Sequence, residues 1–351
     1  MSVQILSPSL AHPERPSWLT SLPRNSSSRS INTISATKID VSSSPSCITT
    51  FPVRVHADKS QITQGAHAAR KTWLDIVPSA KDKELRSHSA GPYGNFFAIT
   101  WPYGKIERVK LATEIIETLW MYDDLAEDIP HNKAVEVHAK LRDSLETDKV
   151  PEQPSRKMLI MGLFHEFAER LVCMDKEGAS RVIDALKSYL KDYDSKKSSL
   201  PGIEEYTEFR IINVGFWIME SFMQWTLGIC LTRAEQDICH EFCLSAGRAM
   251  GLTNDLYSWN VERNDPADRQ WNAVPVIMKQ YDLTEDDAVV YLKGLIVQHE
   301  QKTRQLGAEV RERYAGSRKM AKYVDAMGIM LGGNCFWSSN CPRYNDEGES
   351  K

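Results

Sequence analysis

Residues 254–262 read Asn-Asp-Leu-Tyr-Ser-Trp-Asn-Val-Glu and lie inside a helical pattern that covers residues 234–263. Asn254, Ser258 and Glu262 recur at every fourth position. An α-helix turns by about 100° per residue, so these side chains drift by only about 40° per step along one face. Asn and Ser prefer helix caps to helix interiors, so their placement here needs a reason. An amide, a hydroxyl and a carboxylate can together hold one divalent cation that also accepts an anionic group such as a diphosphate. The alternative is an ordinary polar helix face.

A second group of oxygen ligands ends an apolar helix that begins near residue 106. Asp123, Asp124 and Glu127 follow core-like residues, and the carboxylates of Asp123 and Glu127 share one face because they are four positions apart. Two carboxylates that face one cavity repel each other unless a cation lies between them. Hard oxygen ligands suit Mg²⁺, which also binds phosphate oxygens. The alternative is a solvated acidic helix end that Pro130 terminates.

The chain between residues 49 and 345 follows the helical period throughout. Apolar residues recur at this spacing in 106–129, 157–174, 179–193, 203–227, 234–263, 284–308 and 312–334. Thr284 with Asp287 three positions later is typical of a helix start, so we interpret Glu285 to Asp287 as a first helical turn and not as a metal site. We find no strand-like alternation of useful length and no internal repeat. The prediction is one all-α domain over residues 49–345.

The two ends of the chain differ from this domain. Residues 1–48 are rich in Ser and Pro and contain only Glu14 and Asp40 as acids. This composition predicts a disordered tail. A targeting segment is the alternative, because transit peptides are also rich in serine and poor in acids. We expect residues 346–351 to be disordered as well.

Composition excludes several classes of protein. The net charge is −4 and the basic residues are scattered, which argues against a nucleic-acid partner. No apolar run reaches the roughly 18 residues that a membrane span needs. The seven cysteines are an odd set without a CxxC pair. This favours neither a zinc site nor a disulfide framework, and predicts a cytoplasmic protein.

The two ligand groups resemble the aspartate-rich motif and the Asn/Ser/Glu motif of class I terpene synthases. Within that family the chain is similar to fungal di- and sesterterpene cyclases, including the cyclase domains of chimeric prenyltransferase–cyclases. Three further segments support the resemblance. Residues 50–56 look like the family's opening segment, residues 205–215 like its pyrophosphate-sensing helix, and residues 334–344 like its C-terminal Arg-Tyr segment. The likeness covers residues 50–345.

The resemblance implies an α-helical bundle around a central active-site cavity with three Mg²⁺ ions. Two ions would be bound mainly by Asp123, with support from Glu127 and Asp124. The third would be bound by the Asn/Ser/Glu motif. The resemblance also assigns diphosphate binding to Arg210, Arg343 and Tyr344, and the planar fork of donors on arginine suits such oxygens.

The expected reaction leaves an allyl cation in a dry pocket, where the faces of aromatic rings would stabilise the charge. The candidates are Phe96, Phe97, Trp120, Phe216, Trp217, Phe336 and Trp337, and ordinary core packing is the alternative for each. The resemblance places an effector region at Asn213, Val214 and Gly215. Asn213 departs from the family pattern, since many relatives have Asp at this position.

The function that the resemblance implies is a terpene cyclase, a carbon–oxygen lyase acting on phosphates, with geranylgeranyl diphosphate as the first choice of substrate. Farnesyl and geranylfarnesyl diphosphates are the alternatives. A separate prenyltransferase would supply the substrate to a monomer or homo-oligomer. A trans-prenyltransferase and a non-catalytic helical binding protein are further alternatives. The first should carry two aspartate-rich motifs, and the second should not depend on Mg²⁺.

Overall fold

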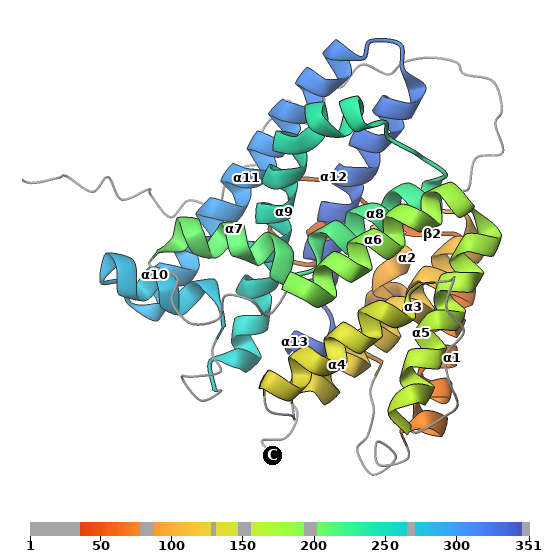
Figure 1. Cartoon of the computed structure of the whole chain (residues 1–351). Helices are drawn as coiled ribbons and strands as arrows, with labels where there is room; N and C mark the ends of the chain where they lie inside the picture. The colour runs from red at the N-terminus through yellow and green to blue at the C-terminus, as the bar shows by residue number, and fades with distance from the viewer. Residues whose placement is uncertain are drawn as a thin grey trace, which may run out of the picture. The chain divides into compact units, whose positions relative to one another are not determined.

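The computed structural model describes residues 36–77, 87–127, 131–146, 156–192, 202–264 and 271–345. These residues belong to one unit that spans residues 34–351, and residues 1–35 and 346–351 lie outside the described part. The α-helices of this unit (Figure 1) are α1 Lys59–Ile76, α2 Phe96–Thr100, α3 Ile106–Glu127, α4 His131–Ser144, α5 Arg156–Met174, α6 Lys176–Asp192, α7 Ile203–Asn213, α8 Phe216–Leu227, α9 Arg233–Glu262, α10 Ala273–Tyr281, α11 Glu285–Arg313, α12 Arg318–Ser338 and α13 Pro342–Asn345.

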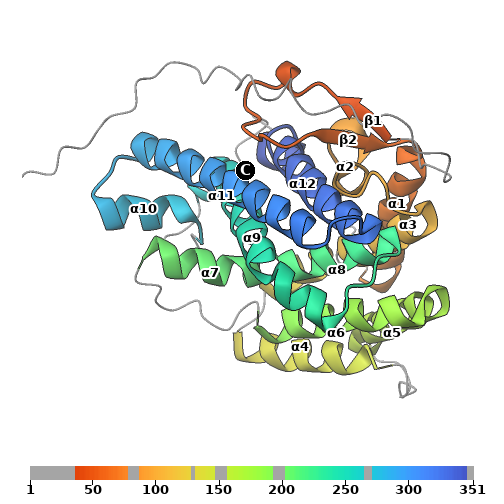
Figure 2. The same ribbon diagram turned by 90° about the horizontal axis from the view of Figure 1, so that it is seen from above.

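Helix α9 is the centre of the arrangement. It packs against α7, α10, α11 and α12, and its C-terminal part also contacts α13. Figure 2 shows α11 and α12 on one side of α8, and α4, α5 and α6 on the other. Helices α1 and α3 pack closely on each other, and α3 also contacts α8 and α5. The all-α prediction is confirmed, and none of the described helices is both long and apolar enough to cross a bilayer.

Two of the predicted helices differ from the structure, because a glycine interrupts the helical backbone where the apolar period does not show a break. The pattern over 203–227 is split into α7 and α8, because Gly215 adopts φ 73° and begins a new helix direction. The pattern over 312–334 is also shifted. Helix α11 runs on to Arg313, and α12 starts only after Gly316, which has φ 86°, and the N-cap Ser317. A left-handed backbone is accessible to glycine without a Cβ clash, so both breaks occur at glycine.

Two short strands were not expected from the sequence. Strand β1, Ala36–Ile39, pairs antiparallel with β2, Val53–His56, with Ile39 opposite Val53. A 3-10 helix, η2 (Val41–Ser43), follows β1, and a second one, η4 (Pro92–Gly94), precedes α2. Four-residue strands are too short to give a clear alternating pattern. For residues 36–48 the structure therefore differs from the predicted disordered tail.

The segment that carries these strands is held by polar contacts to α11 and to the end of α12. The Thr50 backbone N–H donates to Glu300 Oε2 at 2.7 Å, and Arg304 Nη2 donates back to the Thr50 carbonyl at 2.9 Å. The side chains of Ser44 and Asn340 bond each other at 2.8–3.0 Å. Glu300 is buried, which raises its pKa, while the bonds from Thr49 and Thr50 favour its charged form. These long-range contacts order residues whose composition alone predicts disorder.

Close backbone packing along α12 depends on glycine. A Cβ on Gly332 would lie 2.6 Å from the Pro52 carbonyl oxygen, and a Cβ on Gly333 would lie 2.3 Å from the Ile99 carbonyl oxygen. Both neighbours are backbone atoms, which cannot rotate away as a side chain can. Glycine at these positions therefore lets α12 approach β2 on one side and α2 on the other.

This packing predicts the effect of adding one methyl group. Gly333→Ala should lower the free energy of unfolding by about 1–3 kcal/mol, because the new Cβ overlaps the Ile99 backbone. Gly294→Ala is the matched control. Gly294 is exposed in α11 and has no neighbour within 4 Å of an added Cβ, so alanine should raise stability by about 0.5–1 kcal/mol. Urea unfolding measures both changes, and equal stability of Gly333→Ala and the unmodified chain would contradict the close packing.

Candidate active site

Arg210, in the last turn of α7, connects that helix to α9. Its Nε donates to Asp255 Oδ1 at 2.8 Å, and its Nη2 donates to Asn254 Oδ1 at 2.5 Å. Its Nη1 donates to Asn213 Oδ1. Burial lowers the pKa of Arg210, but the combined effects of Asp255, Tyr206 and Glu262 outweigh it and hold the pKa above its usual value. The guanidinium is therefore a fixed positive charge beside the first residue of the Asn/Ser/Glu motif.

Asp255 anchors this charge from inside the protein. Its side chain is fully buried, and it accepts a bond from the Tyr206 hydroxyl at 2.7 Å on its second oxygen. The backbone N–H of Ala273, the first residue of α10, reaches the same oxygen at 3.2 Å. A buried carboxylate needs such partners to offset its desolvation. Asp255 thus joins α7, α9 and α10 at one point.

The three predicted ligands on α9 have different surroundings. Asn254 contacts Arg210 and donates through Nδ2 to the Tyr344 hydroxyl at 2.9 Å. Ser258 is buried and Glu262 is half-buried. Both accept from one amide nitrogen, Nδ2 of Asn272, at 3.3 Å for Ser258 Oγ and 2.9 Å for Glu262 Oε2. The two C-terminal residues of the predicted ligand set, Ser258 and Glu262, therefore share one hydrogen-bond donor.

The acidic group lies at the C-terminal end of α3. Asp123 is half-buried and Asp124 is exposed, and the side chain of Glu127 lies outside the described residues. Asp124 Oδ2 is 2.7 Å from Nε2 of His88, a half-buried residue of the segment before α2. The backbone of that segment is bonded to the fully buried Glu117, which lies about two helical turns before Asp124 on α3: the His88 N–H donates to Glu117 Oε1 at 2.7 Å.

The short helix α13 connects the two predicted ligand groups. Tyr344 contacts Asn254 as described above. The neighbouring Arg343 is exposed to solvent on one side, while protein atoms surround the rest of its side chain. Partial burial lowers the pKa of Arg343, while Tyr344 and the carboxylates of Asp124 and Asp123 raise it above its usual value. Figure 1 shows α13 next to the C-terminal part of α9. Arg210 and Tyr344 thus contact Asn254 of the α9 group, and Arg343 lies within electrostatic range of Asp123 and Asp124 of the acidic group.

Four of the seven candidate aromatic residues form one cluster. Phe97 stacks on Trp120 with ring centroids 5.6 Å apart, and Phe96 meets Trp337 edge to face at 4.9 Å. Phe96 also touches both Phe97 and Trp120. Trp337 in turn packs edge to face on Tyr344 at 5.7 Å. The cluster is therefore continuous with the residue that binds Asn254.

The other three candidates lie apart from this cluster. Phe336 packs on Tyr93 at 6.0 Å. Phe216 and Trp217 pack on each other at 5.2 Å at the start of α8, and Trp217 also stacks near His240. Within the described part of the chain no ring contact joins Phe216 or Trp217 to the cluster. Their position at the α7–α8 break places them next to Asn213, Val214 and Gly215, the predicted effector region.

The donor set fits a hard divalent cation. No three His, Cys, Asp or Glu side chains converge among the described residues. The α9 ligands offer an amide, a hydroxyl and a carboxylate oxygen, which are ligands that Mg²⁺ accepts. Nearby on α12, Asn334 Nδ2 and Ser338 Oγ are buried without a hydrogen-bond partner. These polar atoms lie one turn apart beside the aromatic residues 336 and 337.

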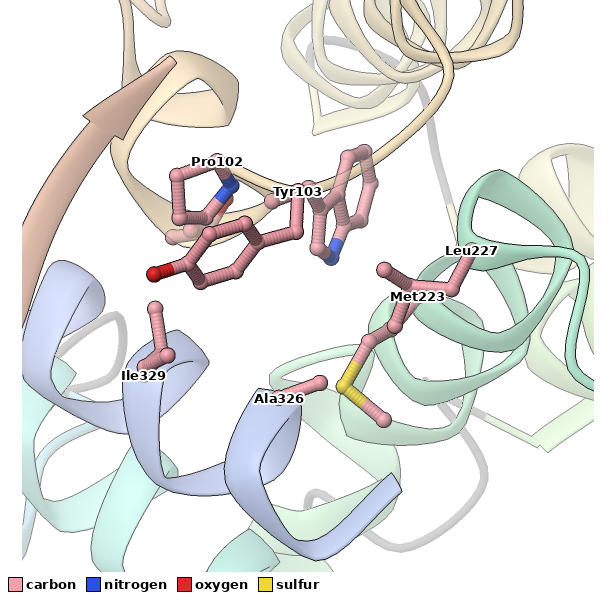
Figure 3. A pocket seen from close by; sticks show the side chains of 8 residues that line it. Pro102, Tyr103, Met223, Leu227, Ala326 and Ile329 are labelled. Carbon is pink, nitrogen blue, oxygen red and sulfur yellow. The ribbon is translucent and has the colours of Figure 1, made fainter. Parts of the chain in front are cut away.

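A small apolar cavity lies between α2, α8 and α12 (Figure 3). Its lining residues are Thr100, Trp101, Pro102, Tyr103, Met223, Leu227, Ala326 and Ile329. Its volume of about 10 Å³ matches a single water molecule. This cavity is therefore too small for an isoprenoid chain. A larger cleft of about 320 Å³ lies at the α11–α12 turn, around Arg311 and Ser317, at the other end of α12 from Trp337.

Residues 114–302 match the family model described as terpene synthase family 2, C-terminal metal binding. The chain belongs to this family. The match extends from the middle of α3 into α11, so it includes the acidic group, Arg210 and the Asn/Ser/Glu motif.

Curated relatives are fungal terpene synthases. A sesterterpene synthase of Colletotrichum orbiculare is 25% identical over 87% of this chain and 44% of its own length. A variediene synthase of Aspergillus brasiliensis is 25% identical over 84% of this chain and 43% of its own length. The chain thus spans less than half the length of these relatives. Among solved structures, aristolochene synthase from Penicillium roqueforti aligns with a TM-score of 0.62 at 17% identity, over 77% of this chain and 94% of that one. This likeness shows the class I terpene synthase helical fold.

Four residues of the site were not singled out from the sequence. Asp255 stands inside the quoted motif, but only the fold shows that its side chain turns inward. Tyr206 lies in the sensing segment, and its bond to Asp255 joins positions that are distant in sequence. His88 and Asn272 come from other segments altogether. A signal existed for Asn272 alone, because an Asn directly before an apolar helical run is typical of an N-cap.

The burial of the Arg210–Asp255 pair predicts a large loss of stability when it is broken. Asp255→Ala should lower the free energy of unfolding by about 3–5 kcal/mol, because it leaves a buried guanidinium without its counter-ion. Urea denaturation measures the change.

The control is a second bridge between the same two helices. Glu208 on α7 lies 2.5 Å from Arg248 on α9, but its side chain is 53% exposed. Glu208→Ala should therefore lower the unfolding free energy by less than about 1 kcal/mol. Similar losses for the two variants would contradict the anchoring role of Asp255.

Proposed function

We propose that the chain is a class I terpene cyclase. It would ionise a linear isoprenyl diphosphate with Mg²⁺, cyclise the resulting carbocation and release diphosphate. The observation that carries the proposal is the direct contact between Arg210 and Asn254, with Tyr344 bonded to the same asparagine. A positive charge is thereby fixed beside a predicted metal ligand, as a site for a metal-bound diphosphate requires.

The metal ligands of the proposal are those expected from the sequence. Asp123, supported by Asp124 and Glu127, would hold two of three ions, and the Asn/Ser/Glu motif would hold the third. When bound, Mg²⁺ would neutralise negative charge that develops on the leaving diphosphate. The electrostatic effect of both acids on Arg343 supports a shared location for the two ligand groups.

The chain's own donors would bind the diphosphate oxygens. Arginine has five N–H donors, and Arg210 uses three nitrogens in the bonds described above, so two N–H groups remain for an oxygen ligand. Arg343 is accessible from solvent, and the Tyr344 hydroxyl is already fixed by Asn254. Donors that are oriented before the substrate arrives stabilise charge without reorganisation.

The aromatic cluster of Phe96, Phe97, Trp120 and Trp337 would stabilise the migrating positive charge. Its rings are buried or half-buried, and they continue through Trp337 to Tyr344, at the diphosphate end. Ring faces attract cations most strongly where water is excluded. The cluster extends from the residue that bonds Asn254 to the buried Phe97, and we propose that the cyclising chain would lie along it.

For the substrate we propose geranylgeranyl diphosphate, with farnesyl and geranylfarnesyl diphosphates as alternatives. The choice of the C20 substrate rests on the resemblance to di- and sesterterpene cyclases, and the names of the curated relatives, which include sesterterpene and variediene synthases, support a terpene-forming reaction. A separate prenyltransferase in the cytoplasm would supply the diphosphate.

A substrate panel tests the proposal. The chain is incubated with C10, C15, C20 and C25 diphosphates and Mg²⁺, and the products are analysed by gas chromatography. We expect a cyclic hydrocarbon or alcohol from the C20 substrate, and none when EDTA is present. Chain elongation on addition of isopentenyl diphosphate would indicate a prenyltransferase instead. Absence of any product from every substrate would remove the cyclase proposal.

Loss of a single ligand should stop the reaction. Loss of a residue that only orients a metal ligand typically lowers metal affinity or activity 10–100-fold, so loss of a ligand itself should lower turnover at least about 100-fold. We expect this for Asn254→Ala and for Asp123→Ala. The matched control is Asp286→Ala, which removes an exposed acid from the first turn of α11 and should leave turnover unchanged. Normal turnover by Asn254→Ala would refute the metal assignment.

A further inference from the structure

We infer that Asn272 is a positioning residue that holds Ser258 and Glu262 in place for metal binding. The inference rests on the proposed function, because it concerns the same metal site. Asn272 lies outside the motif, ten residues beyond Glu262, and is 1% exposed. It is the N-cap of α10, so its side chain is fixed by the helix that follows it.

The amide nitrogen of Asn272 reaches three successive levels of α9. Nδ2 lies 2.8 Å from the Asp255 carbonyl oxygen, 3.3 Å from Ser258 Oγ and 2.9 Å from Glu262 Oε2. These positions are spaced by three and four residues, so they form one helix face. A single side chain thus contacts two of the three predicted ligands, and its bond to the Asp255 carbonyl ties both of them to the backbone of α9.

Both ends of the Asn272 side chain are in use. Its Oδ1 accepts from the Val274 backbone N–H at 2.9 Å and caps α10, while its Nδ2 donates to α9. Aspartate could serve as the cap, but it would place a second negative charge against Glu262. Serine could also serve as the cap, but it is too short to bridge to α9. Only an amide combines an acceptor for the cap with a donor for a carboxylate.

Glu262 needs such a partner because of its place in the helix. It is the last residue of α9, where the helix dipole disfavours a negative charge and where helix ends fray. An ionised carboxylate has about four lone-pair positions, so the bond from Asn272 leaves others for a cation. Groups that bond a metal ligand from behind fix its orientation, and their loss typically weakens metal binding 10–100-fold.

The test measures metal binding without turnover. Mn²⁺ is titrated into the full chain in the presence of inorganic diphosphate, and free Mn²⁺ is followed by electron paramagnetic resonance. Asn272→Ser keeps the α10 cap, since serine and asparagine are similar N-caps, but loses the amide donor. We expect its Mn²⁺ affinity to fall about 10-fold. Asn272→Gly, which also tolerates the cap position, should show the same loss.

A matched control separates positioning from stability. Asn95 is also a buried asparagine N-cap, on α2, and its amide donates to Ser89 Oγ at 2.7 Å instead of to a predicted ligand. Asn95→Ser should leave Mn²⁺ affinity unchanged even if thermal stability falls. Turnover by Asn272→Ser should recover at high Mg²⁺ concentration, because its ligands are displaced and not removed.

The outcomes distinguish the two proposals. If the unmodified chain binds Mn²⁺ and Asn254→Ala weakens that binding, the metal site stands. If Asn272→Ser and Asn272→Gly then bind as tightly as the unmodified chain, the positioning role of Asn272 is wrong. If the unmodified chain binds no Mn²⁺ with diphosphate, both the proposed function and the role of Asn272 are wrong.

Discussion

The buried guanidinium of Arg210 is the interaction on which the geometry of the site depends. It must find partners in the protein interior, and it finds them on α9 in Asp255 and Asn254 and on its own helix in Asn213. These bonds fix the rotation of α9 about its own axis relative to α7. They therefore also fix the face on which the predicted ligands of α9 lie. Gly251 supports the same contact, since a Cβ there would lie 2.8 Å from the Arg210 side chain.

Most of the proposed chemistry lies at helix ends and breaks. Arg210 stands just before the break at Gly215, the acidic group ends α3, and Glu262 ends α9. Helix ends expose backbone groups that need external partners, so side chains from other segments gather there. This explains why a short helix, α13, and an N-cap, Asn272, contribute as much to the geometry as the long helices do.

The sequence predicted the fold class, because long apolar repeats such as 106–129 and 234–263 follow directly from a helical period. The two ligand groups stay a prediction, which rests on spacing that is local to each helix. The sequence could not place β1 or residues 36–48, since these are ordered by distant partners such as Glu300 and Asn340. It missed the split at Gly215 because apolar periodicity continues across it. Nor could it separate Phe97, in the cluster, from Phe216, which lies apart from it.

The residues that the sequence missed contact Arg210 or the predicted ligands from other segments of the chain. Asp255 bonds Arg210 and is itself bonded by Tyr206, and His88 contacts Asp124. Asn272 donates to Ser258 and Glu262 on α9. Each bond joins segments that are far apart in sequence, so no local sequence pattern predicts it. A ligand alone has several rotamers, and a buried partner selects one of them. The motif therefore specifies which atoms can bind a cation, whereas the surrounding fold determines whether those atoms are held where one cation can reach them together.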